Sequence, residues 1–110
     1  MAGCIFCKII KKEIPSNIVL EDDDIIAFHD IHPSADIHIL IVPKVHIESF
    51  RDLEVHHKDV LLKVYEVATK LVDQFNLGDR AYRVVVNGGK AQEIPHLHFH
   101  FLGGNWKKNV

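Results

Sequence analysis

The first half of the chain alternates short apolar runs with turn residues. Residues 18–20, 25–28 and 37–42 are rich in β-branched side chains, which predicts three strands. The acidic residues 22–24 predict a turn between the first two strands, and the polar residues 30–36 predict a wide loop before the third. These three segments therefore indicate a meandering sheet.

The second half begins with a helical pattern. Between about residues 53 and 75, apolar side chains recur at steps of three and four, which predicts an amphipathic helix covering one face of the sheet: Leu61, Val64, Ala68, Leu71 and Phe75. Further strands are expected over residues 81–86 and 96–102, and a short helix over residues 5–10. The prediction is one α+β domain over residues 1–110, with a mainly antiparallel five-stranded sheet.

The last predicted strand carries three histidines. In a strand, successive side chains point to opposite faces, so His96, His98 and His100 share one face. The apolar residues between them share the other face and can pack under the helix. Core packing therefore explains the apolar face but gives no reason for three imidazoles opposite it.

Imidazole chemistry suits attack on phosphorus. With a reference pKa of about 6.5, a large neutral fraction exists near neutral pH, and one ring nitrogen can act as a nucleophile. His98 is the candidate nucleophile because it has a histidine on each side, and His100 would donate to a phosphoryl oxygen or to the leaving group. The glycines at 103 and 104 would let the chain turn close to a ligand. An alternative is that the histidines bind a catalytic metal that activates water.

Cys4 and Cys7 are the two cysteines of the chain, spaced Cys-x-x-Cys. They could form a redox pair, two small buried hydrophobes, or half of a tetrahedral zinc site. The spacing alone does not choose among these.

The motif His-φ-His-φ-His-φ-φ over residues 96–102 (φ, apolar) resembles the histidine-triad (HIT) superfamily. The segments 4–10, 27–31, 38–47 and 86–89 are similar to its zinc-containing Hint branch, in the same order. The resemblance covers nearly the whole chain. It implies a homodimer with a HIT-like fold. It also implies that the protein hydrolyses purine nucleotides, as derivatives of AMP and GMP: nucleoside 5′-phosphoramidates, such as adenosine 5′-monophosphoramidate, and acyl adenylates. It also implies a nucleotidyl-histidine intermediate.

The resemblance assigns roles to residues of this chain. His98 matches the nucleophile, His100 a phosphate and leaving-group partner, and His38 a fourth histidine that supports the triad. Asp30 matches the acid that holds the ribose hydroxyls, and a group of mostly apolar residues matches the base pocket: Ile5, Phe6, Ile9, Phe28, His29, Ile31 and Leu40. Asn87 and Gln92 match phosphate-side contacts. A structural zinc ion would be held by Cys4, Cys7, His46 and His96.

The sequence departs from the family pattern in three places. The segment between Asn87 and His96 is about two residues shorter than in many relatives, and residues 105–110 are only loosely similar. Glu93 stands where some relatives carry a serine near the leaving group, and its carboxylate should weaken phosphate binding or alter leaving-group preference. Dinucleoside polyphosphate hydrolysis, or nucleotide binding without catalysis, are the alternative functions.

Charge and composition argue against several other classes of protein. A formal net charge of −2 leaves no surplus for a nucleic-acid backbone, and no apolar run reaches the roughly 20 residues of a membrane span. The N-terminus does not predict a signal peptide, and two close cysteines do not form a secreted disulfide framework. We expect a cytoplasmic protein. His32, His56 and His57 receive no role.

Overall fold

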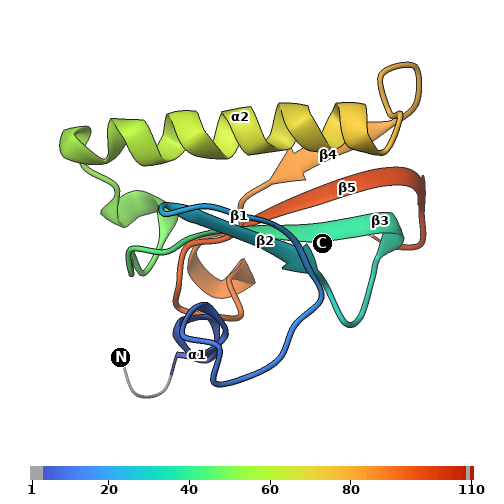
Figure 1. The fold of residues 1–110 in the computed structure, drawn as a ribbon. Coiled ribbons are helices and arrows are strands. Elements are labelled where there is room, and N and C mark those ends of the chain that lie inside the picture. The colour runs from blue at the N-terminus through green and yellow to red at the C-terminus, as the bar shows by residue number, and fades with distance from the viewer. Residues whose placement is uncertain (1–3, 109) are drawn as a thin grey trace.

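The structure is a computed structural model that describes residues 4–108 and 110. These described residues form two α-helices and five strands: α1 (Ile5–Ile10), β1 (Ile18–Glu21), β2 (Ile25–His29), β3 (Ala35–Pro43), α2 (Lys58–Gln74), β4 (Tyr82–Val85) and β5 (Phe99–Trp106). Short 3-10 turns lie at Phe50–Asp52, Val55–His57 and Gly89–Ala91. The strands form one antiparallel sheet in the order β1-β2-β3-β5-β4 (Figure 1). The predicted α+β fold is confirmed.

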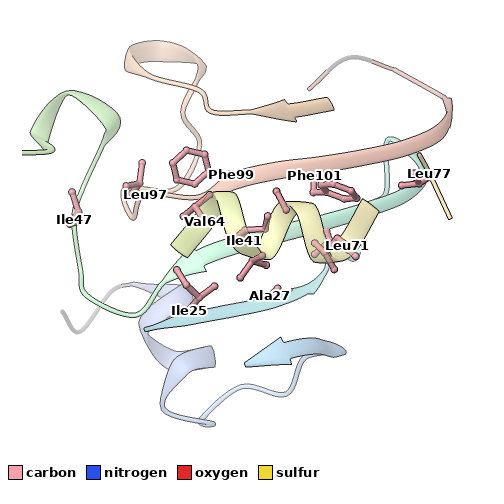
Figure 2. Close-up of a cluster of buried hydrophobic side chains, with 13 residues drawn as sticks. Ile25, Ala27, Ile41, Ile47, Val64, Leu71, Leu77, Leu97, Phe99 and Phe101 are labelled. Carbon is pink, nitrogen blue, oxygen red and sulfur yellow. The ribbon is translucent and has the colours of Figure 1, made fainter. Parts of the chain in front are cut away.

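The sheet is covered on both faces, by α2 on one side and by α1 on the other (Figure 1). Along β2, Ile25 and Ala27 pack toward α2, while Ile26 and Phe28 pack toward α1, as strand alternation requires. The core on the α2 side joins β2, β3 and β5 to the helix stripe around Leu71 (Figure 2). None of the described helices is long and apolar enough to cross a membrane.

The long helix begins later than the sequence pattern predicts. Leu53 and Glu54 are extended (ψ 139° and 168°), so they interrupt any helix before α2 starts at Lys58. The buried stripe consists of Val64, Val67, Ala68 and Leu71, whereas Leu61 is 38% exposed. The predicted start at residue 53 and the core position of Leu61 were therefore wrong.

The last strand is also displaced from its predicted range. β5 starts at Phe99, because the preceding chain leaves β3 and the Leu97 N–H donates to the Ile47 carbonyl at 2.6 Å. Side-chain alternation nevertheless continues through this extended segment, since Leu97, Phe99 and Phe101 all enter the α2-side core (Figure 2). The histidines therefore lie on the face opposite α2, as predicted, although His96 and His98 precede the strand.

The two glycines after the histidine run lie inside β5, so the expected turn toward a ligand does not occur there. A Cβ at Gly103 would lie 2.4 Å from Leu77 Cδ1, which shows that the missing side chain makes room for the buried Leu77. Gly104 has a φ of +81°, a conformation that other residues rarely adopt. Packing and backbone geometry account for both glycines.

Candidate active site and metal cluster

A pocket of about 440 Å³ opens on the α1 side of the sheet. Most of the residues predicted for catalysis and nucleotide binding line it together: Phe6, Asp30, His38, Leu40, Asn87, Glu93, His98 and His100. They come from α1, from β3 and β5, and from the loops after β2 and β4. The topology thus collects residues separated by up to ninety-four positions of the sequence into one concave site.

The other residues predicted for the base pocket and the phosphate side do not line this pocket. Ile9 and Phe28 are buried in the α1-side core, and Phe28 packs against the Phe6 ring with 5.8 Å between ring centroids. Ile5 and Ile31 are 44% and 86% exposed. The remaining two residues, His29 and Gln92, make other contacts. The His29 ring packs on Phe75, and the Gln92 amide donates to the carbonyls of Glu48 and Ile94 at 2.6 and 2.9 Å.

Several residues that the sequence reasoning left out also line the pocket: His32, Ser34, Ala91, Ile94, Lys108 and Val110. Ser34 lies between the second and third strands, four residues before His38, and this closeness is the one sequence signal that could have indicated it. Lys108 carries no local signal, because the return of β5 along β3 brings it to the pocket.

His98 is held as a neutral imidazole with one free nitrogen. Its Nδ1 lies 2.8 Å from the His96 carbonyl oxygen, which can only accept, so Nδ1 carries the proton. Nε2 therefore keeps its lone pair. Burial lowers the pKa of His98, although the His96 carbonyl and the charges of Asp30 and Glu93 oppose this. The arrangement leaves an uncharged nitrogen nucleophile in the pocket.

A chain of hydrogen bonds orients His100 differently. The Ser34 N–H donates to His38 Nδ1 at 2.9 Å, so the His38 proton must reside on Nε2. That Nε2–H lies 2.9 Å from His100 Nδ1 and donates to it, which leaves the His100 proton on Nε2. Burial, with smaller contributions from His98 and His38, lowers the pKa of His100 from 6.5 to about 4. His100 is thus a neutral proton donor.

Asp30 follows β2 and retains accepting capacity beside these histidines. One carboxylate oxygen accepts from the His32 N–H at 2.8 Å, and the other lies 3.5 Å from His38 Nε2. A carboxylate offers about four lone-pair directions, so further hydroxyl donors can bind. Its negative charge also favours protonation of His38, but burial and the charge of Lys108 lower the pKa of His38.

The predicted metal ligands gather in a separate cluster. Cys4 Sγ lies 3.3 Å from His96 Nδ1, and Cys7 Sγ lies 3.3 Å from His46 Nδ1 and 3.6 Å from His96 Nδ1. The first turn of α1 brings the two cysteines close in space, and the Cys7 N–H donates to Cys4 Sγ at 3.2 Å. All four ligand atoms lie within 4.8 Å of one another. Both cysteines are free thiols.

The protonation of His96 fits a metal ligand. Its Nε2 lies 2.8 Å from the Pro43 carbonyl oxygen, so Nε2 carries the proton and the Nδ1 lone pair points at the two sulfur atoms. Two thiolates and two imidazoles form the donor set that tetrahedral zinc prefers. The cluster can therefore hold a metal ion.

Asp30, His38 and His100 are also close enough to suggest a metal site, since their ligand atoms lie within 4.8 Å. The Ser34 N–H argues against it, because it occupies the lone pair of His38 Nδ1 and leaves a proton rather than a lone pair on Nε2. A metal on Nε2 would require that bond to break. This group is consequently better suited to transferring protons.

Comparison with known proteins identifies the relatives of the chain. The family model described as "Scavenger mRNA decapping enzyme C-term binding" matches residues 3–110. The chain is 42% identical over 102 residues to a purine nucleoside phosphoramidase of Escherichia coli (strain K12), covering 91% of this chain and 86% of that protein. It is 46% identical over 109 residues to a 14 kDa zinc-binding protein of Zea mays, covering 93% and 84%.

Among solved structures, a HIT family hydrolase from Legionella pneumophila Philadelphia 1 has a TM-score of 0.91 to this chain and 41% identity, with 94% of each chain covered. The sequence motif, the fold and the relatives agree. The chain belongs to the histidine-triad (HIT) family of nucleotide hydrolases.

Proposed function

We propose that the protein hydrolyses purine nucleoside 5′-phosphoramidates and acyl adenylates through a nucleotidyl intermediate on His98. The observation that carries the proposal is the opposite protonation of two adjacent histidines in one pocket, with a free nitrogen on His98 and an N–H on His100. Cleavage of a P–N bond requires a nucleophile and a hydrogen-bond donor that assists proton transfer to the departing nitrogen. The E. coli relative is named a purine nucleoside phosphoramidase, which supports the substrate class.

The first step forms a bond between His98 Nε2 and phosphorus and breaks the P–N bond. The electron pair of that bond goes to the amine nitrogen, which leaves as a neutral amine after taking a proton from a water molecule that accepts a hydrogen bond from the His100 Nε2–H. His100 keeps its own proton, because losing it would leave an imidazolate anion. The His96 carbonyl accepts from His98 Nδ1–H and stabilises the positive charge that develops on the ring.

In the second step, water attacks the same phosphorus. For a phosphoramidate this is the water that gave its proton to the amine, so its hydroxide bonds to phosphorus while the bond to His98 breaks and the electron pair of that bond returns to His98 Nε2. The products are a nucleoside monophosphate and the enzyme in its starting protonation state. For an acyl adenylate the first leaving group is a carboxylate, which needs no proton, so the attacking water releases its proton to solvent.

The remaining pocket residues would hold the nucleotide. Asp30 would accept from the ribose hydroxyls, and Phe6 and Leu40 would face the base, with Ile9 and Phe28 supporting them from the core. Ile5 and Ile31 would lie at the edge of the base pocket, whereas His29, whose ring packs on Phe75, does not fit that role. Asn87 and Glu93 would face the phosphate side, whereas the bonds of the Gln92 amide suit a role in shaping that loop.

A structural zinc ion would be held by Cys4, Cys7, His46 and His96, and four protein ligands leave no position for a reacting water. The Zea mays relative is named a zinc-binding protein. Zinc would tie α1 to the segment before β5, and His96 in that segment provides the carbonyl that orients His98. Two reduced cysteines suit the cytoplasm.

We also propose that residues 1–110 form a single domain that works as a homodimer. β4 is an edge strand, and Tyr82 and Val84 on it are 48% and 44% exposed. Leu62 and Tyr65 on α2 are likewise 56% and 64% exposed. An unpaired strand edge beside exposed apolar side chains suits pairing with a second copy. Sedimentation at micromolar concentration would test this.

The deciding experiment is mass spectrometry of enzyme mixed with adenosine 5′-monophosphoramidate and quenched under conditions that preserve phosphohistidine. We expect an added adenosine monophosphate on the peptide that contains His98. Turnover without any adduct on that peptide, under conditions where the second step limits the rate, would contradict the mechanism. Faster turnover of diadenosine tetraphosphate than of the phosphoramidate would instead favour a dinucleoside polyphosphate hydrolase.

A further inference from the structure

The chain after β5 is fixed beside the pocket. Trp106, the last residue of β5, pairs with Ala35 at the start of β3. The N–H groups of Lys107 and Lys108 then both donate to the Ser34 carbonyl, at 2.7 and 3.2 Å. Because Ser34 is buried, with 2% of its surface exposed, these bonds hold the backbone of both lysines at one place on the loop between β2 and β3.

The pocket itself is poor in positive charge. Asp30 and Glu93 contribute two carboxylates, and burial lowers the pKa values of the His38 and His100 imidazoles. Among the described residues that line the pocket, Lys108 is the one lysine or arginine. A nucleotide phosphate entering this site would meet two negative side chains, so a cation is needed to offset their repulsion.

The location of Lys108 suits that task. Its charge acts on His38, where it opposes the effect of Asp30 on the pKa. His38 in turn donates to His100, the residue placed next to the phosphate. Lys108 therefore lies on the side of the pocket where phosphoryl oxygens would be handled.

We propose that Lys108 is a substrate-binding residue, with its ammonium group contacting the phosphate of the bound nucleotide. The inference rests on the proposed function and deepens it, since the segment after β5 then completes the nucleotide site of its own chain. Lys107 is the natural comparison. It is bonded to the same Ser34 carbonyl and is also exposed, but it does not line the pocket.

The test compares AMP with adenosine as ligands of the purified, metal-loaded protein, using calorimetry on Lys108→Met, Lys108→Arg and Lys107→Met. A charge-assisted contact from an exposed lysine predicts that Lys108→Met raises the Kd for AMP about tenfold. The Kd for adenosine, which has no phosphate, should stay unchanged. Lys108→Arg should bind AMP nearly as tightly as the native chain. Lys107→Met should bind AMP as tightly as the native chain.

Salt provides a second readout. Loss of the contact should flatten the dependence of AMP affinity on ionic strength in Lys108→Met, because one screened charge pair is missing. Three results would each overturn the inference. Lys108→Met could lose affinity for adenosine and AMP equally, it could leave the Kd for AMP unchanged, or Lys107→Met could weaken AMP binding as much as Lys108→Met does.

Turnover of adenosine 5′-monophosphoramidate by the native protein separates this inference from the proposed function. If the native protein binds AMP in a Lys108-dependent way but forms no product, the hydrolase proposal fails and the role of Lys108 stands. If it hydrolyses the substrate but the Kd for AMP does not depend on Lys108, only the proposed role of Lys108 fails.

Discussion

The metal-ligand cluster and the catalytic pocket each contain a histidine protonated on Nε2, but the two rings present opposite nitrogens to their clusters. His96 donates to the Pro43 carbonyl and so presents a lone pair to two cysteines. His38 accepts from the Ser34 N–H and so presents a proton to His100. A backbone carbonyl leaves the first imidazole with a lone pair that could bind a metal, and a backbone N–H makes the second a hydrogen-bond donor. The partner behind each ring decides its chemistry.

The largest effect that separates the clusters should come from His98→Ala. Removing the nucleophile should lower kcat by about 10⁴-fold or more, while AMP still binds and the melting temperature changes little. Steady-state kinetics, calorimetry and thermal unfolding would check this, with the exposed His56→Ala as the control. Native turnover in His98→Ala would remove His98 from the reaction.

Removing the metal should act on stability instead. We expect one zinc per chain, and we expect chelation to lower Tm by about 10 °C or more, because four ligands, two of them buried, would be left without their ion. Metal analysis and scanning calorimetry measure both quantities. In a Cys4→Ala, Cys7→Ala double variant the chelator should have no further effect. If chelation leaves the Tm of the native protein unchanged, the result would argue against bound zinc.

A smaller effect should distinguish the proton donor from the nucleophile. His100→Ala should slow phosphoramidate hydrolysis by about 10²-fold, the contribution typical of a group that assists proton transfer to the leaving atom. Acyl adenylate hydrolysis should fall markedly less, because its carboxylate leaving group needs no proton. Single-turnover rates with the two substrates give the ratio. Equal losses would mean that His100 acts on the phosphate alone.

The smallest effect concerns pH. The pKa of His100 is lowered from 6.5 to about 4 in the folded protein, so between these values the unfolded chain binds more protons. Stability should therefore decrease as pH falls from about 6.5 to about 4. Thermal unfolding across this range should show a shallower dependence in His100→Gln than in the native chain. An identical slope in both proteins would show that His100 does not contribute.

Local patterns of apolar and polar residues predicted much of the fold. The alternation of residues 96–101 assigned three apolar side chains to the core and three histidines to the opposite face, although only part of the run is a regular strand. Patterns could not locate the start of α2, because the extended residues Leu53 and Glu54 interrupt a sequence of helical period. The role of Gly103 depends on Leu77, which is distant in sequence.

Side-chain alternation and motif spacing are local properties of the chain, so the family, the α+β fold and the candidate histidines and cysteines could be predicted from the residues alone. The free nitrogen of each histidine and the lysine that reaches the pocket could not be predicted, because they follow from the folded arrangement. Those outcomes depend on Pro43, Ser34 and the return of β5 along β3. Such partners come from distant segments, or from backbone groups whose direction a residue name does not specify.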